Sequence, residues 1–197
     1  MYAYAVETDN LVRTQTKQAV AKESNHNGNQ LKRRILASEE RSLTIQFERT
    51  LEYLDFAQSL ANDLRVLVVD VPKQLKEYQF SQDQVGSWRI LLEAALKQEF
   101  LLKTGLSSQI KACVHELTDL DKIRLHIAKQ LSEHVAVIAL VNPSESLSDF
   151  YELVLDVELN LPEVKVVILD KSIWAMTDMV WQVDGECRVR EMENMYI

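Results

Sequence analysis

The sequence predicts an α+β protein in which a long N-terminal helical region is followed by a small β-α-β-β-β head domain. The 197-residue chain has only 4 glycines and 3 prolines, so few turns and long helices are expected. An apolar stripe at spacings of three, four and seven residues extends from Leu43 to Val68. Continuous aliphatic runs, which are typical of buried strands, follow His134.

These patterns divide the chain into three segments. Residues 1–30 are polar and include a run rich in Asn, Ser and Gly, which favours loop structure. Residues 31–132 form a helical arm and helical subdomain. Residues 133–197 form the small α/β head. The arm and the head are therefore expected to have different roles.

The first long helix is predicted from its apolar stripe, which would cover one face over more than twenty residues. Pro72 should end or kink this helix near Asp70. The positions of the stripe are Leu43, Phe47, Leu51, Leu54, Ala57, Ala61, Leu64 and Val68.

Three further helices are predicted before the head. One extends from about residue 85 to 102 and ends at Gly105, a residue that commonly terminates helices. A shorter one covers residues 110–117. Thr118 or Asp119 is expected to cap the last, whose apolar face extends from Leu120 to Leu131.

The head is predicted from two aliphatic runs and a hairpin. Residues 135–141 and 164–169 read as buried strands, joined through a helix over residues 147–157 by a right-handed crossover. Two more strands, residues 179–183 and 187–192, flank the turn dipeptide Asp184-Gly185.

Charge and composition exclude several classes of protein. The formal net charge of -8 would repel a phosphate backbone, so no nucleic-acid partner is expected. The longest apolar run, residues 135–141, is too short to cross a bilayer, so no membrane insertion is expected. The two cysteines form no Cys-x-x-Cys pair. With no signal peptide visible, a cytoplasmic location is predicted.

The motifs of common catalytic and cofactor sites are missing. There is no Gly-x-Ser-x-Gly, no His-Glu-x-x-His and no glycine-rich phosphate loop, so the chain is not predicted to be a P-loop ATPase. Cys113 and His115 lie two apart, and on a helix such side chains point in nearly opposite directions. No catalytic, cofactor-binding or metal-binding residues are therefore predicted.

The head resembles the globular domain of the FliH/SctL family, the stator proteins of flagellar and type III secretion ATPases, which are similar to peripheral-stalk E subunits of rotary ATPases. In that family the loop after the second strand reads Asp-Pro-x-Leu-x-x-Gly-Asp. Lys171 and Thr177 stand here in place of the family's Pro and Gly. The matching residues are Asp170, Ser172, Ile173, Asp178 and the hairpin residue Gly185.

The resemblance implies a non-enzymatic homodimer that binds a secretion ATPase and ties it to a cytoplasmic ring or sorting platform. A long apolar stripe agrees with this, because such a stripe needs another surface to cover it. The residues expected to bind partners are Phe47, Leu51, Leu54, Leu64, Asp170 and Trp174.

Two alternatives differ in class. The first is another cytoplasmic protein-binding adaptor or a secretion chaperone. The second is an enzyme whose ligand lies at the ends of parallel strands, where open α/β sheets bind ligands. In that case the loops after Val141 and Leu169 would form the crevice, with Asn142, Ser144, Asp170 and Ser172.

Overall fold

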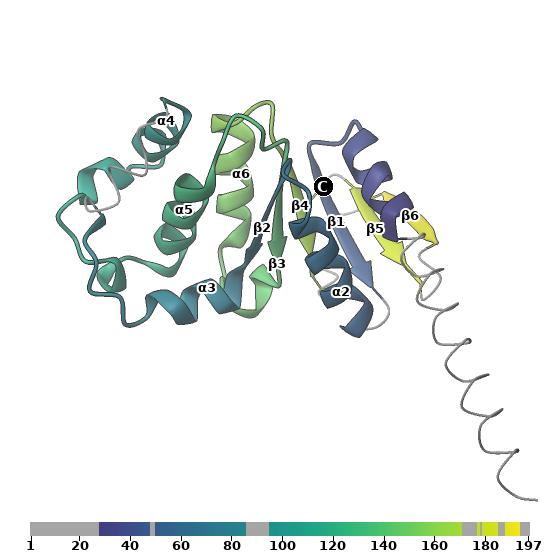
Figure 1. The fold of residues 1–197 in the computed structure, drawn as a ribbon, viewed down its shortest axis with the longest axis horizontal. Helices are drawn as coiled ribbons and strands as arrows, with labels where there is room; N and C mark the ends of the chain where they lie inside the picture. The colour runs from purple at the N-terminus through teal and green to yellow at the C-terminus, as the bar shows by residue number, and fades with distance from the viewer. Residues whose placement is uncertain are drawn as a thin grey trace, which may run out of the picture.

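One six-stranded sheet organises the chain in a computed structural model that describes residues 28–47, 50–85, 95–170, 177, 179–184 and 188–193. The strand order is β2-β3-β4-β1-β5-β6 (Figure 1). β6 is antiparallel to β5 and the other pairs are parallel. The strands are β1 (Ser42–Phe47), β2 (Val66–Asp70), β3 (Val137–Val141), β4 (Lys165–Leu169), β5 (Met179–Val183) and β6 (Val189–Glu193).

Helices cover both faces of this sheet. Residues 28–37 are helical and precede β1. The later helices are α2 (Thr50–Ala61), α3 (Val71–Tyr78), α4 (Ala95–Lys103), α5 (Asp119–Gln130) and α6 (Phe150–Asn160). Short 3₁₀ turns are η2 (Leu106–Gln109), η3 (Val114–Glu116) and η4 (Pro143–Glu145).

The prediction of one long helix from Leu43 to Val68 is wrong, because this segment forms β1, α2 and β2. Residues 42–47 read Ser-Leu-Thr-Ile-Gln-Phe, a strict alternation of polar and apolar side chains. This period of two belongs to a strand, and short apolar runs mimic helical spacing when they are read over a long window. Leu43 and Ile45 are fully buried on one face of the sheet.

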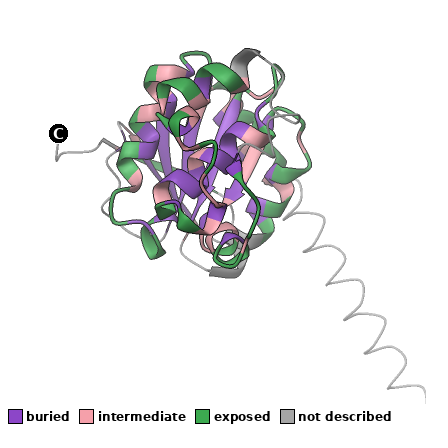
Figure 2. Cartoon of the chain, turned by 90° about the vertical axis from the view of Figure 1, so that its left-hand side faces the viewer, coloured by how far each residue is buried: buried purple, intermediate pink, exposed green. Residues whose placement is uncertain are grey.

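The core has two parts, one on each face of the sheet. On one face, Ile138 and Ile168 pack with residues of α3, α4, α5 and α6. On the other, Leu43 and Val167 pack with the helix of residues 28–37 and with α2. Figure 2 shows the buried strands enclosed by helices with exposed outer faces. The predicted fold class, a long helical region with a small head, is therefore wrong, because β1 and β2 complete one mixed sheet.

Several local predictions are confirmed. Thr118 caps α5 by accepting a hydrogen bond from the Asp121 backbone N–H at 3.1 Å. Gly105, with φ of 78°, follows α4 in the left-handed region that favours glycine. The predicted strands of the head correspond to β3, β4, β5 and β6, and its helix corresponds to α6.

Two helices predicted before the head have different outcomes. Of the helix expected over residues 85–102, residues 86–94 lie outside the described residues, and α4 covers the part from Ala95 onwards. The helix expected over residues 110–117 is replaced by the short turn η3. In the described part of the chain, no helix combines the length and apolar character that a bilayer crossing requires.

Lys165, at the start of β4, forms hydrogen bonds with the C-terminal end of the helix of residues 28–37 and so connects this helix to the sheet. The Lys165 ammonium donates to the Ile35 carbonyl at 2.9 Å and also to the Ser38 carbonyl. The Ile35 carbonyl also accepts a hydrogen bond from the Ser38 backbone N–H at 3.3 Å, and a cation at this end interacts favourably with the helix dipole.

Replacing Lys165 with Met keeps the apolar stem and removes these donors. We expect Lys165→Met to lower the free energy of unfolding by about 1–2 kcal/mol. Urea unfolding monitored by circular dichroism measures this change. Lys111→Met, at an exposed position, is the control and should change it by less than about 0.5 kcal/mol. Equal effects of the two substitutions would contradict this role of Lys165.

Candidate functional site

Three oxygen-bearing side chains stand in a row at the carboxyl ends of β2, β3 and β4. Asp70 ends β2, Asn142 follows β3 and Asp170 follows β4. The register aligns these ends, because Asp70 pairs with Val141, which pairs with Leu169. In open α/β sheets this edge is where ligands bind. We call Asp70, Asn142, Ser144 and Asp170 the strand-end site.

Asp170 and Ser144 fix the shape of this site. The buried carboxylate of Asp170 accepts hydrogen bonds from the Ser144 hydroxyl at 2.7 Å and from the Ser144 backbone N–H at 3.0 Å. These two bonds hold η4 against the end of β4. Asp170 is therefore a positioning residue, whereas Ser144 is exposed.

Asn142 has two unusual properties. Its backbone adopts φ of 48° and ψ of 45°, a left-handed conformation that Asn tolerates better than most residues. Its Oδ1 atom is buried and has no hydrogen-bond partner within the described residues. A buried acceptor without a partner is uncommon in folded proteins, so this atom is suited to a donor or cation supplied by a ligand.

Asp70 occupies the N-cap of α3. Its Oδ1 atom accepts a hydrogen bond from the Lys73 backbone N–H at 3.2 Å, and Pro72 lies in the first turn of the helix. Sequence reasoning missed Asp70 because β2 was interpreted as helix. The missed signal was the Val-rich run Val-Leu-Val-Val, which is followed by an Asp that lies two residues before a Pro.

The connection between β1 and α2 does not have the sequence of a phosphate-binding loop. Only Glu48 and Arg49 separate the end of β1 from the start of α2. A phosphate-binding loop between a strand and a helix has the form Gly-x-x-x-x-Gly-Lys-Ser/Thr, and this motif occurs nowhere in the sequence. The β1–α2 connection therefore lacks the glycine-rich segment whose backbone N–H groups surround phosphates.

A small cavity of about 220 Å³ lies between the first residues of α5 and the segment before α6. Its volume is below the range of about 300–1,000 Å³ that is usual for ligand pockets. Its lining residues are Thr118, Asp119, Leu120, Ser146, Leu147, Ser148 and Asp149.

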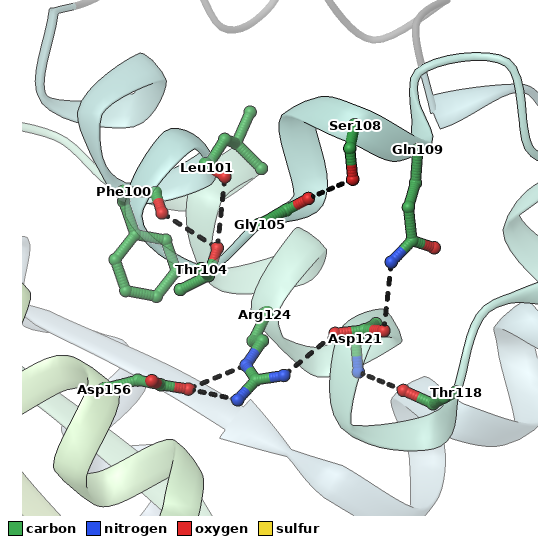
Figure 3. Close-up of polar contacts among 10 residues, drawn as sticks. All are labelled: Phe100, Leu101, Thr104, Gly105, Ser108, Gln109, Thr118, Asp121, Arg124 and Asp156. Atoms are coloured by element: carbon green, nitrogen blue, oxygen red, sulfur yellow. Dashed lines mark hydrogen bonds and ion pairs between the residues drawn. The ribbon is translucent and has the colours of Figure 1, made fainter.

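A second polar cluster joins α5 to α6 and lies apart from the strand ends. Arg124 on α5 forms ion pairs with Asp121 on the same helix and with Asp156 on α6 (Figure 3). Gln109 donates to Asp121 at 3.3 Å. Because these groups pair with one another, the cluster is structural. Among the described residues there is no group of three or more His, Cys, Asp or Glu residues arranged to hold a metal ion.

The structure separates most of the residues predicted to bind partners. Phe47 is half-buried, with its ring centroid 5.4 Å from that of Phe56, and Leu64 is 89% exposed. The side chains of Leu51 and Leu54 and all of Trp174 lie outside the described residues. Asp170 lies at the strand-end site. A partner-binding role for these residues stays a prediction.

The residues of the enzyme alternative are brought together in part. Ser144 and Asp170 are hydrogen-bonded, and Asn142 precedes η4. Ser172 lies outside the described residues.

Comparisons with known proteins give structural neighbours only. No family model matches the sequence, and no curated protein matches it. Among solved structures, cbiO1 from Clostridium perfringens, part of the ABC transporter complex cbiONQ, has a TM-score of 0.59 and 15% identity, covering 78% of this chain and 77% of that one. An inward-facing putative metal-chelate type ABC transporter has a TM-score of 0.55 and 13% identity, covering 79% and 73%.

These neighbours correct the sequence-based interpretation. The FliH/SctL resemblance is wrong, because the similar structures come from ABC transporters. The prediction of a non-enzymatic type III secretion stator or adaptor, and of a chain that is not an enzyme, is contradicted by the same finding. The same finding contradicts the predicted partners, which were a second copy of the chain, a secretion ATPase and a sorting-platform protein.

The strand-end site has oxygen atoms of the kind that bind Mg²⁺ in nucleotide-binding proteins, but the chain lacks the glycine-rich phosphate loop. Its oxygen atoms suit Mg²⁺, which proteins bind through one or two carboxylates while substrate phosphates supply further ligands. The β1–α2 connection does not supply a phosphate loop. At these levels of identity the comparisons show the fold alone: the chain shares the mixed, mostly parallel α/β architecture of these two ABC transporter structures.

Proposed function

We propose that this chain binds a nucleotide as its magnesium complex at the strand-end site, in a cytoplasmic protein with the ABC ATPase fold. The observation that carries the proposal is the row formed by Asp70, Asn142 and Asp170 at the carboxyl ends of adjacent parallel strands. This is the edge at which such folds bind ligands.

The chemistry of the site favours a metal-bound ligand over a free anion. Asp70 and Asp170 give the site two carboxylates, which would repel an uncomplexed triphosphate. A magnesium ion removes this repulsion, since it binds carboxylate and amide oxygens on one side and phosphate oxygens on the other. Asp70 and Asn142 are the residues that would hold it, and Asp170 keeps Ser144 in place beside them.

Isothermal titration calorimetry with ATP, in buffer containing magnesium or EDTA, tests this proposal. We expect binding with magnesium and at least tenfold weaker binding with EDTA. Phosphate release, followed in the same samples and compared with a protein-free blank, shows whether bound ATP is hydrolysed. Equal affinity with and without magnesium would contradict the proposed role of the oxygen row.

Two substitutions alter the charge of the row in opposite directions. Asp70→Asn keeps a good N-cap for α3 and removes a carboxylate, so affinity for magnesium-ATP should fall at least about tenfold without loss of stability. Asn142→Asp adds a carboxylate at a backbone conformation that Asp also tolerates, so affinity should rise. Asp83→Asn, at an exposed position away from the strand ends, is the control. Equal changes in the affinity for magnesium-ATP in all three variants would contradict the proposal that this site binds the metal.

A further inference from the structure

The outer face of α6 carries an exposed apolar stripe. Tyr151, Leu155 and Leu159 follow at intervals of four residues, which places them on one face of the helix. They are 38%, 47% and 76% exposed, whereas Leu153, Val154 and Val157 on the opposite face are buried in the core. We call Tyr151, Leu155 and Leu159 the α6 stripe.

Acidic side chains surround the α6 stripe. The 35 residues from Gln130 to Val164 contain seven carboxylates and no Lys or Arg. Glu152 and Asp149 are exposed beside the first turn of α6, and Glu163 is exposed beyond its end. Two cations reach α6 from elsewhere in the chain. Arg124 is paired with Asp156, and Arg41 donates to the Glu158 backbone carbonyl at the C-terminal end.

We propose that the α6 stripe binds a basic amphipathic helix of a partner protein. The stripe forms an i, i+4 ridge about 12 Å long, which can pack into the corresponding groove of another helix. Lysines or arginines that flank the partner's apolar residues would face the carboxylates around the stripe, and such complementarity provides specificity and faster association. None of the three stripe residues belongs to the strand-end site.

Charge argues against two other occupants. A second copy packed through the same face would place its carboxylates against identical carboxylates, which is unfavourable. An anionic membrane surface attracts basic segments and would repel this acidic one.

Fluorescence anisotropy with a labelled helical peptide of about 16 residues tests the proposal. The peptide has leucines four residues apart with lysines between them, and a scrambled peptide of the same composition breaks this spacing. Binding of the first peptide should be at least tenfold tighter than binding of the second. Equal binding would show that only net charge is recognised and would overturn the proposal.

Two double variants locate the contact. Leu155→Ser/Leu159→Ser removes the apolar atoms of the stripe and should weaken binding about tenfold or more. Leu102→Ser/Ile110→Ser removes two other aliphatic side chains, which are 67% and 43% exposed, and should leave binding unchanged. Circular dichroism melting confirms that each variant folds. Equal losses in both variants, or no loss in the first, would overturn the proposal, as would self-association of the wild type that the first variant abolishes.

Discussion

Arg124→Met should destabilise the protein by about 3 kcal/mol, because it leaves two largely buried carboxylates without their cation. The guanidinium donates to Asp156 through Nε at 2.7 Å and to Asp121 through Nη1 at 2.9 Å. The side chains of Arg124, Asp121 and Asp156 are only 16%, 12% and 23% exposed. Burial opposes the charge of Arg124, yet these hydrogen bonds hold its pKa above the ordinary value.

Chemical denaturation at neutral pH measures the loss. The triple variant Arg124→Met/Asp121→Asn/Asp156→Asn removes the carboxylates as well as the cation, so it should recover much of the lost stability. A single variant as stable as the wild type would show that the cluster does not hold α5 to α6.

The second large effect is acid destabilisation through His126. Burial lowers the pKa of His126 to about 4, and Lys129 contributes to the same shift. Its Nδ1 atom is hydrogen-bonded to the Tyr78 hydroxyl at 2.8 Å, and burial raises the pKa of Tyr78 to about 12. The unfolded chain, in which a histidine titrates near pH 6.5, therefore binds a proton that the folded protein excludes between pH 6.5 and 4.

The stability that depends on neutral His126 is fully present above pH 6.5 and is lost as the pH falls towards 4. The expected loss is about 3 kcal/mol. Urea unfolding between pH 7 and pH 4 measures the free energy of unfolding of the wild type and of His126→Gln. In this variant a neutral amide oxygen can accept a hydrogen bond from the Tyr78 hydroxyl. The variant should lose less stability over this range, while the exposed control His134→Gln should follow the wild type. Parallel curves for wild type and His126→Gln would contradict this account.

The parts of the fold that could be predicted from the sequence are those with strong local signals. The run that forms β3 is continuous and aliphatic, and Thr118 is a favoured cap. Gly105 adopts a conformation in which glycine avoids a steric penalty. Such features depend on neighbouring residues, so one sequence suffices to find them.

The parts that were missed depend on contacts between distant segments. β1 lies between β4 and β5 in the sheet, although more than 110 residues separate it from either in the sequence. Its six residues carry a weak signal alone, and the neighbouring helix α2 extended the apparent helical spacing. Once β1 and β2 were interpreted as helix, the parallel sheet was lost, and with it the alignment of Asp70 with the ends of β3 and β4.

Part of the site can nevertheless be predicted from the sequence. Asn142, Ser144 and Asp170 follow the two strands that were correctly predicted, so an edge formed by the loops after β3 and β4 could be proposed. The hydrogen bonds between Ser144 and Asp170 required coordinates, because no local pattern predicts contacts across 26 residues.

The central claim, that a metal–nucleotide complex binds at the strand-end site, is tested most directly by locating the metal. Nuclear magnetic resonance spectra of the ¹⁵N-labelled protein with ATP can be recorded with magnesium and after substitution by paramagnetic manganese. We predict selective broadening of the amide signals from residues 70, 71, 73, 142, 144, 145 and 170, and no broadening when manganese is added without ATP. Broadening centred elsewhere in the protein, or none with manganese and ATP together, would contradict the claim.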